Sequence, residues 1–100
     1  MEQSVDAIVI GAGVIGSSVG LELARGGRQV VVVDKGLGAG AGSTSASSSI
    51  IRYSYSTRDA ILTAWEAAQM WFDWERHLGT VDPDGMARFV ECGNLILRTT

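Results

Sequence analysis

The chain has 100 residues, a net charge of −3 and a single cysteine, Cys92. Its basic residues are scattered rather than gathered into a patch, which argues against a nucleic-acid surface, and one cysteine excludes an internal disulfide. No basic segment precedes the first apolar run, which is far shorter than the roughly 20 residues of a membrane helix. We therefore expect a cytoplasmic protein that binds no nucleic acid and has no membrane span.

A short apolar run ends in the pattern Gly-x-Gly-x-x-Gly at residues 11–16. In this spacing the first glycine makes the tight turn off a strand, the second lets the backbone approach a pyrophosphate, and the third lets the next helix pack close. The amides of Val14 and Ile15, at the start of that helix, have no intrahelical acceptor and direct partial positive charge at an anion. The pattern predicts a strand that runs into a phosphate-holding turn.

Residues 14–25 carry apolar side chains at helical spacing and are followed by two glycines suited to a helix end. The β-branched run at residues 29–33 predicts a strand buried on both faces of a parallel sheet, and it ends on Asp34. An acid about 20 residues beyond the glycines is where the ribose of an adenine dinucleotide binds. The order predicts an α/β fold, a Rossmann-type βαβ unit for FAD or NAD(P), with Asp34 as ribose ligand. The alternative for Asp34 is a residue that only caps a turn.

A glycine-rich run at residues 36–42 leads into a hydroxyl-rich run at residues 43–49. The composition fits a flexible linker, yet a long loop inside a compact domain is often functional. In the functional reading, small residues let the backbone lie against a ligand, while Ser43, Thr44 and Ser45 offer hydroxyls and amides to phosphates. The sequence leaves linker and ligand loop equally open.

Arg52 follows two apolar residues and precedes an aromatic one. In one reading its guanidinium pairs with a carboxylate on a neighbouring element, which is the commoner situation in proteins. In the other it is a planar, bidentate clamp for a substrate carboxylate, for which its geometry is better suited than that of lysine. Both readings stay open at this point.

Residues 57–79 are predicted to form one helix, which Thr57 caps and Gly79 ends. His77 has no second His or Cys at ligand spacing, so we expect a solvated residue at the helix end and no metal site. A turn follows, and residues 89–97 are predicted to be a strand with a bend at its Gly-Asn pair. Cys92 is expected to be a packing residue rather than a nucleophile.

The predicted elements suggest a division of the chain at residue 79. We expect an FAD-binding βαβ unit with its cofactor loop and following helix over residues 1–79, and the start of substrate-domain strands over residues 80–100. Two parallel strands cannot bury both faces of their sheet. We therefore expect the chain to be the front of a larger two-domain protein.

Several segments together resemble the N-terminal part of the FAD-dependent amine oxidoreductases of the D-amino-acid oxidase superfamily. The resemblance is strongest to the sarcosine oxidase and dimethylglycine dehydrogenase branch and covers essentially the whole chain. The segments are Asp6 to Asp34, Gly42-Ser43-Thr44-Ser45, Ser49-Ile50-Ile51-Arg52-Tyr53, the Trp-rich helix, and Cys92-Gly93-Asn94-Leu95. The Gly-Ser-Thr-Ser loop followed by Ile-Ile-Arg is more discriminating than the glycines and favours FAD over NAD.

The resemblance implies that the FAD pyrophosphate rests on the glycine turn, that an acid and its neighbour meet the adenosine ribose, and that loop hydroxyls follow the cofactor toward the flavin. The residues so implied are Gly11, Ala12, Gly13, Val14, Ile15, Gly16, Asp34, Lys35, Ser43, Thr44 and Ser45. Asp stands at position 34 where many relatives have Glu, which keeps the acceptor. The loop contains no histidine, so no covalent FAD attachment is expected through it.

The resemblance also implies that Arg52 binds the carboxylate of an amino-acid substrate near the flavin. The implied reaction is hydride transfer from the carbon beside the amine nitrogen to the flavin, which gives an imine that water hydrolyses. Relatives are several times longer, so we expect little or no turnover from these 100 residues alone. Two other functions stay open, a NAD-dependent Rossmann dehydrogenase or reductase and a non-catalytic nucleotide-binding module.

Overall fold

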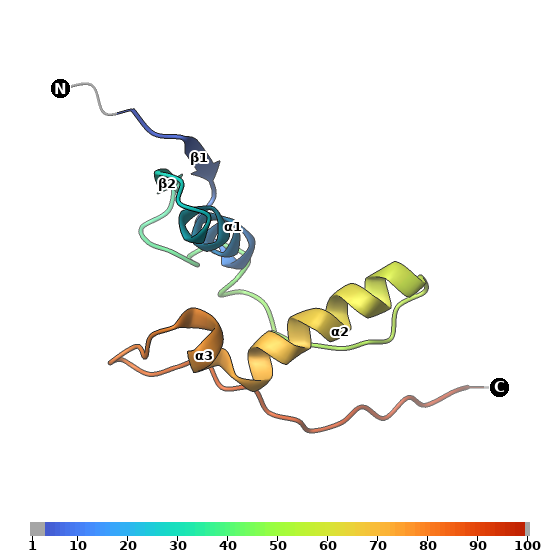
Figure 1. Cartoon of the computed structure of the whole chain (residues 1–100). Helices are drawn as coiled ribbons and strands as arrows, with labels where there is room; N and C mark the ends of the chain where they lie inside the picture. Colours follow the sequence, from blue (N-terminus) through green and yellow to red (C-terminus); the bar gives the residue numbers. More distant parts are fainter. Residues whose placement is uncertain (1–3, 100) are drawn as a thin grey trace. The chain divides into compact units, whose positions relative to one another are not determined.

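The computed structural model describes residues 4–99, so the outermost residues of the two expected segments, 1–3 and 100, lie outside the described part. The chain forms two compact units, Met1–Ile50 and Ile51–Thr100. The first unit contains β1 (Ala7–Ile10), α1 (Val14–Arg25) and β2 (Val30–Val33), and the second contains α2 (Arg58–Phe72) and α3 (Trp74–Leu78) (Figure 1).

The first unit is a βαβ unit, as the sequence predicted. β1 and β2 pair in parallel, in a register that begins with Ala7 opposite Val30. The carboxylate of Asp6 accepts a hydrogen bond from the Gln29 amide at 2.8 Å, which fixes the start of the ladder. Parallel strands need a crossover between them, and α1 provides it. The predicted Rossmann-type architecture is thereby confirmed for this unit.

The C-terminal end of α1 forms a Schellman motif. The Gly27 amide donates to the Ala24 carbonyl at 2.9 Å, and the Arg28 amide donates to the Leu23 carbonyl at 3.1 Å. Gly27 has φ +79°, a left-handed conformation that costs glycine little. The predicted end of the helix at the glycine pair is therefore confirmed.

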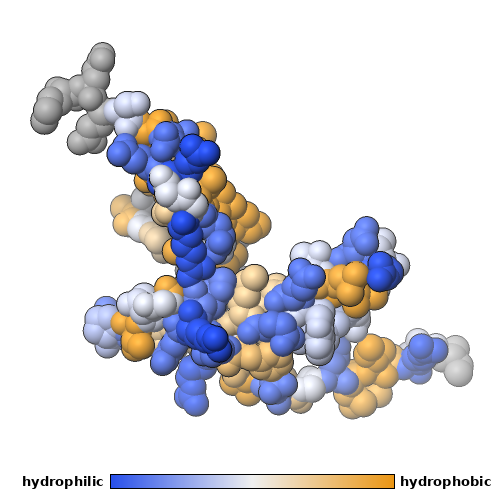
Figure 2. Space-filling model, in the orientation of Figure 1, coloured by the Kyte–Doolittle hydropathy of each residue, from blue (hydrophilic) through white to orange (hydrophobic). Residues whose placement is uncertain are grey.

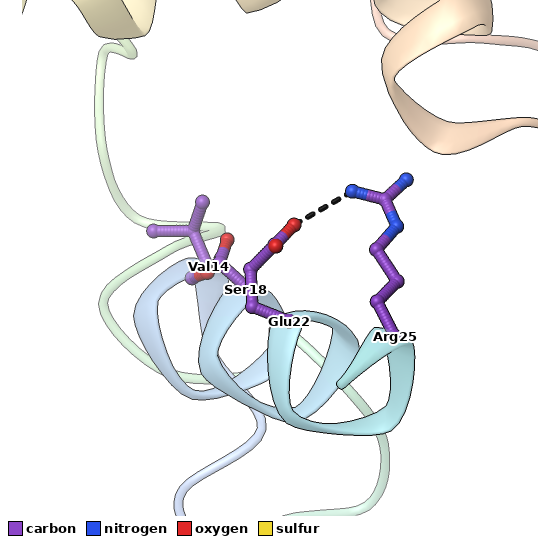
Figure 3. Close-up of polar contacts among 4 residues, drawn as sticks. All are labelled: Val14, Ser18, Glu22 and Arg25. Atoms are coloured by element: carbon purple, nitrogen blue, oxygen red, sulfur yellow. Dashed lines mark hydrogen bonds and ion pairs between the residues drawn. The ribbon is translucent and has the colours of Figure 1, made fainter. Parts of the chain in front are cut away.

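One exposed face of α1 carries polar contacts within the helix (Figure 3). The Ser18 hydroxyl donates to the Val14 carbonyl at 2.6 Å, and Arg25 forms an ion pair with Glu22 at 2.6 Å. Exposed pairs of this kind contribute little to stability. These contacts therefore add little to the stability of α1.

The packing of α1 covers one face of the sheet only. Gly20 is buried on α1, and a Cβ built there would lie 2.7 Å from a methyl of Val32. Alternate residues of a strand point to opposite faces, and Ile8 and Ile10 on β1 are 63% and 88% exposed. The prediction that residues 29–33 are buried on both faces is wrong for this unit, because one helix and two strands leave apolar surface open (Figure 2).

The second unit begins with α2, whose first turn is capped as predicted, since the Thr57 hydroxyl accepts from the Ala60 amide at 3.3 Å. The predicted single helix over residues 57–79 is wrong at Asp73, which has the non-helical angles φ −134° and ψ 65°. This residue separates α2 from α3, and the rings of Trp71 and Trp74 stack at 4.2 Å across the break. α3 ends at the predicted glycine, Gly79, with φ +71°.

Residues 80–99 contain a turn but no strand. The predicted turn is present, with the Gly85 amide donating to the Asp82 carbonyl at 3.0 Å. The predicted strand over residues 89–97 is not formed, because a strand requires a partner for its ladder and none pairs with it within residues 4–99. Gly93 adopts φ +74° and provides the expected bend. None of the helices within residues 4–99 has the length and apolar character needed to cross a bilayer.

Candidate functional site

The glycine turn between β1 and α1 has the backbone geometry that its sequence predicted. Gly11 adopts φ +104°, a conformation suited to glycine, and its amide donates to the Val33 carbonyl at 2.7 Å. A Cβ built on Gly16 would lie 1.7 Å from the Gly11 carbonyl oxygen and 3.4 Å from a methyl of Val9. Only glycine can therefore occupy position 16 while α1 starts this close to the strand.

Asp34, at the end of β2, reaches back to the glycine turn. One carboxylate oxygen accepts from the Ala12 amide at 2.7 Å, and the other accepts from the Gly36 amide at 2.7 Å. These two amides, the first more than the second, hold the pKa of Asp34 below its ordinary value, and the positive charge of Lys35 adds to the effect. Asp34 is exposed, and each ionised oxygen has a further lone pair for a ligand hydroxyl.

The loop at residues 35–47 folds onto the glycine turn, which a free flexible linker would not do. The Thr44 hydroxyl accepts a hydrogen bond from the Val14 amide at 3.0 Å. The Gly40 amide donates to the Ala12 carbonyl at 2.7 Å, and Ser45 bonds back to the Gly40 carbonyl within the loop. Thr44 is half-buried, whereas the other predicted loop residues, Lys35, Ser43 and Ser45, are exposed.

The N-terminal end of α1 is open to an anion. The expectation that the Val14 and Ile15 amides face an anion is met for Ile15 but not for Val14, whose amide donates to Thr44. The amides of Ile15 and Gly16 lie in the first turn and donate to no acceptor within residues 4–99. The side chain of Ile15 is 79% exposed, so this end of the helix is accessible. The helix dipole adds partial positive charge at the same point. The arrangement can bind a phosphate, with the Asp34 carboxylate nearby to accept hydrogen bonds from hydroxyls.

Arg52 belongs to the second unit, and its contact there differs from the structural ion pair that was one of its two predicted roles. Its guanidinium carbon lies 5.4 Å from the centroid of the Tyr55 ring, a cation–π contact that the sequence analysis missed. Within residues 4–99 it pairs with no carboxylate, so the expected structural ion pair is not found there. The Tyr53 ring in turn packs edge-on against Trp65 at 5.6 Å.

Two glycines of the site were missed by the sequence analysis. Gly20 lies one helical turn after Gly16, and this spacing of small residues on one face was a usable signal for close helix–strand packing. Gly40, with φ +73°, positions the amide that meets Ala12. It is one of several glycines in a low-complexity run, so nothing local distinguished it from its neighbours.

Comparison with known protein families gives a match over almost the whole chain. The family described as "FAD dependent oxidoreductase" (DAO) matches residues 6–100, a range that includes the glycine turn, Asp34, the loop and Arg52. Neither a curated protein nor a solved structure matches the chain.

Proposed function

Because the chain belongs to the DAO family of FAD-dependent oxidoreductases, we propose that its glycine turn holds the FAD pyrophosphate and that its substrates are amines or amino acids. Members of the family bind FAD, which accepts a hydride from the substrate when it is bound. The observation that carries the cofactor proposal is the open end of α1 beside the Asp34 carboxylate, which is 2.7 Å from the Ala12 amide. The family also favours FAD over the NAD-dependent alternative.

The residues around the turn fit the adenosine and pyrophosphate parts of FAD. The amides of Ile15 and Gly16, which have no acceptor in the described part of the chain, are donors for phosphate oxygens, and the exposed Asp34 carboxylate is an acceptor for ribose hydroxyls. The exposed Ser43 hydroxyl is a further donor, whereas the Ser45 hydroxyl donates to the Gly40 carbonyl and can only accept from a ligand. The proposed cofactor residues are Gly11, Ala12, Gly13, Val14, Ile15, Gly16, Asp34, Lys35, Ser43, Thr44 and Ser45.

The amine substrate class is proposed on the chemistry of Arg52. Its guanidinium has planar donors, and no carboxylate within residues 4–99 occupies them. The contact with the Tyr55 ring leaves the edge of the guanidinium free to bind an anion. A substrate that carries a carboxylate beside its amine, as in the sarcosine oxidase and dimethylglycine dehydrogenase branch, suits such a clamp. In this proposal Arg52 orients the substrate and takes no part in proton transfer.

The substrate proposal is tested by the visible absorbance of bound flavin. Because little turnover is expected from these 100 residues alone, the complete FAD-loaded enzyme is used; it is mixed without oxygen with sarcosine, dimethylglycine or D-alanine, and with D-lactate as a carboxylate that lacks an amine. We expect the amines alone to bleach the flavin band. Bleaching by D-lactate and none of the amines would overturn the substrate class but leave the cofactor assignment standing.

The role of Arg52 is tested by Arg52→Lys in the complete enzyme, with Arg88→Lys as the matched control in the same unit. Loss of a bidentate, charge-assisted contact should raise KM for carboxylate-bearing amines about 10- to 100-fold. The FAD content and the absorbance spectrum should not change. An unchanged KM in Arg52→Lys would rule out the carboxylate clamp.

A further inference from the structure

We propose that Thr44 is a positioning residue that caps α1 from the loop and holds the phosphate-binding turn in shape before the cofactor arrives. This inference rests on the proposed cofactor site and adds to it. It gives Thr44 a role in the cofactor-free protein, whereas the resemblance implied only a contact with bound FAD.

The first step is that α1 lacks a cap of its own. Its N-cap residue is Gly13, which has no side chain to accept a hydrogen bond from the first turn. Helices usually begin with Ser, Thr, Asp or Asn at this place. Thr44, 30 residues further along the chain, provides the missing oxygen by accepting from the Val14 amide at 3.0 Å.

The second step concerns the space above Gly13. A Cβ built on Gly13 would lie 2.9 Å from the Thr44 hydroxyl oxygen, closer than side-chain carbons approach such atoms. Gly13 therefore leaves room for the Thr44 hydroxyl of the same chain. This role is separate from the room that a glycine here leaves for a phosphate. Thr44 is correspondingly half-buried while residues 41–43 and 45–49 are exposed.

The third step is that this cap completes a row of three contacts. Asp34 binds the Ala12 amide, Gly40 binds the Ala12 carbonyl, and Thr44 binds the Val14 amide. These groups belong to three consecutive peptide units of the turn, and all three partners come from one segment, residues 34–44. The amides of Ile15 and Gly16 are left for an anion. The segment thus fixes the turn while keeping its binding end open, and this preorganisation favours affinity.

The test compares Thr44→Val with Thr44→Ser, and with Thr63→Val as a matched control. Valine keeps the shape of threonine but cannot accept the hydrogen bond, whereas serine can. Thr63 carries the same hydroxyl, which donates to the Asp59 carbonyl at 2.8 Å on α2 in the other unit. Three quantities are measured on the full chain: hydrogen exchange of the Val14 amide without FAD, the melting temperature without FAD, and the dissociation constant of FAD.

In Thr44→Val we expect faster exchange at Val14, a melting temperature lower by about 4–8 °C, and an FAD dissociation constant raised roughly fivefold. Thr44→Ser and Thr63→Val should keep the wild-type Val14 exchange and FAD affinity. Weaker FAD binding with unchanged Val14 exchange would overturn the proposal, because Thr44 would then be a cofactor ligand only. Faster exchange with unchanged FAD affinity would also overturn it, since the cap would not serve binding. If the wild-type chain binds no FAD, the proposed cofactor site fails, and this inference fails with it.

Discussion

The two units of the chain differ in the kind of contact found inside each of them. In the first unit, hydrogen bonds link distant residues: Asp34 to Ala12 over 22 positions and Thr44 to Val14 over 30. In the second unit, side-chain hydrogen bonds such as that from Thr63 to the Asp59 carbonyl span four positions. Contacts between residues further apart in that unit's sequence are made by aromatic rings, such as those of Phe72 and Phe89, whose centroids lie 5.1 Å apart.

This difference separates a region built to hold a ligand from a region built of local helices. Directional hydrogen bonds between distant segments fix peptide groups in one orientation, which a phosphate site requires. Ring contacts tolerate more variation in position. We therefore expect the first unit to be the more sensitive to single substitutions, and the following changes test that expectation.

The largest expected effect comes from Gly16→Ala in the first unit. The new Cβ would meet the Gly11 carbonyl oxygen at 1.7 Å, and backbone cannot yield as a flexible side chain can. We expect the free energy of unfolding to fall by about 3 kcal/mol and FAD retention to be lost. Denaturant unfolding and the flavin absorbance of the purified protein measure the two effects.

The control for this change is Gly42→Ala, because a Cβ there meets nothing within 4 Å. It should change stability by no more than about 0.5 kcal/mol. A Gly16→Ala protein as stable as Gly42→Ala would contradict the close approach of α1 to the turn.

A smaller loss is expected from Gly20→Ala, which tests the contact between α1 and β2. Its Cβ would lie 2.7 Å from a methyl of Val32, so the side chain or helix must shift. The cost of overpacking, about 1–3 kcal/mol, is partly offset by the better helix propensity of alanine, about 1 kcal/mol. We expect a net loss of about 1 kcal/mol in urea unfolding. In the double variant Gly20→Ala/Val32→Ala the overpacking cost should be smaller, because the Val32 methyl is gone. If the stability losses of the two single variants simply add in the double variant, the contact is contradicted.

Thr57→Ala makes the corresponding test in the second unit. It removes the oxygen that accepts from the Ala60 amide, and the expected loss is about 1 kcal/mol. Thr57→Ser should keep most of the wild-type stability. If the comparison between the units is correct, the FAD affinity of Thr57→Ala stays at the wild-type value. If Thr57→Ala lowered the FAD affinity as much as a substitution in the glycine turn does, the proposed difference between the two units would be wrong.

The smallest expected effect is the pH dependence contributed by Asp34. Its pKa is lower in the folded protein because the Ala12 and Gly36 amides bind the ionised form. The resulting stability is fully present above the pKa of the unfolded chain, about 3.9, and is lost as pH falls through the lowered folded value. Unfolding measured over a pH series should therefore show a steeper acid loss in the wild type than in Asp34→Asn. Parallel curves would show that the two amides do not favour the ionised form.

The sequence predicted the first unit closely, because its signals are local. The glycine spacing, the β-branched run and the glycine pair predicted β1 and placed α1 and β2 to within one residue. The bond between Thr44 and Val14 could not be predicted, since no periodic pattern links residues 30 positions apart. The same limit explains why the loop could not be told from a linker.

In the second unit the sequence predicted the helix ends better than the helix interior. Thr57 and Gly79 are conspicuous cap residues, and both are found where they were expected. The break at Asp73 was missed because the apolar spacing continues through it, so hydrophobic periodicity alone gave no reason to end α2. The strand expected over residues 89–97 needed a partner strand, and the sequence of one segment does not show whether a partner is available.

The double anchoring of Ala12 has a kinetic consequence. A rotation of either peptide plane beside this residue would break a 2.7 Å hydrogen bond, to Asp34 on one side or to Gly40 on the other. Both planes are therefore locked before any encounter with a dinucleotide. The rate of capture should then rise in proportion to dinucleotide concentration, with no slow isomerisation of the backbone to limit it.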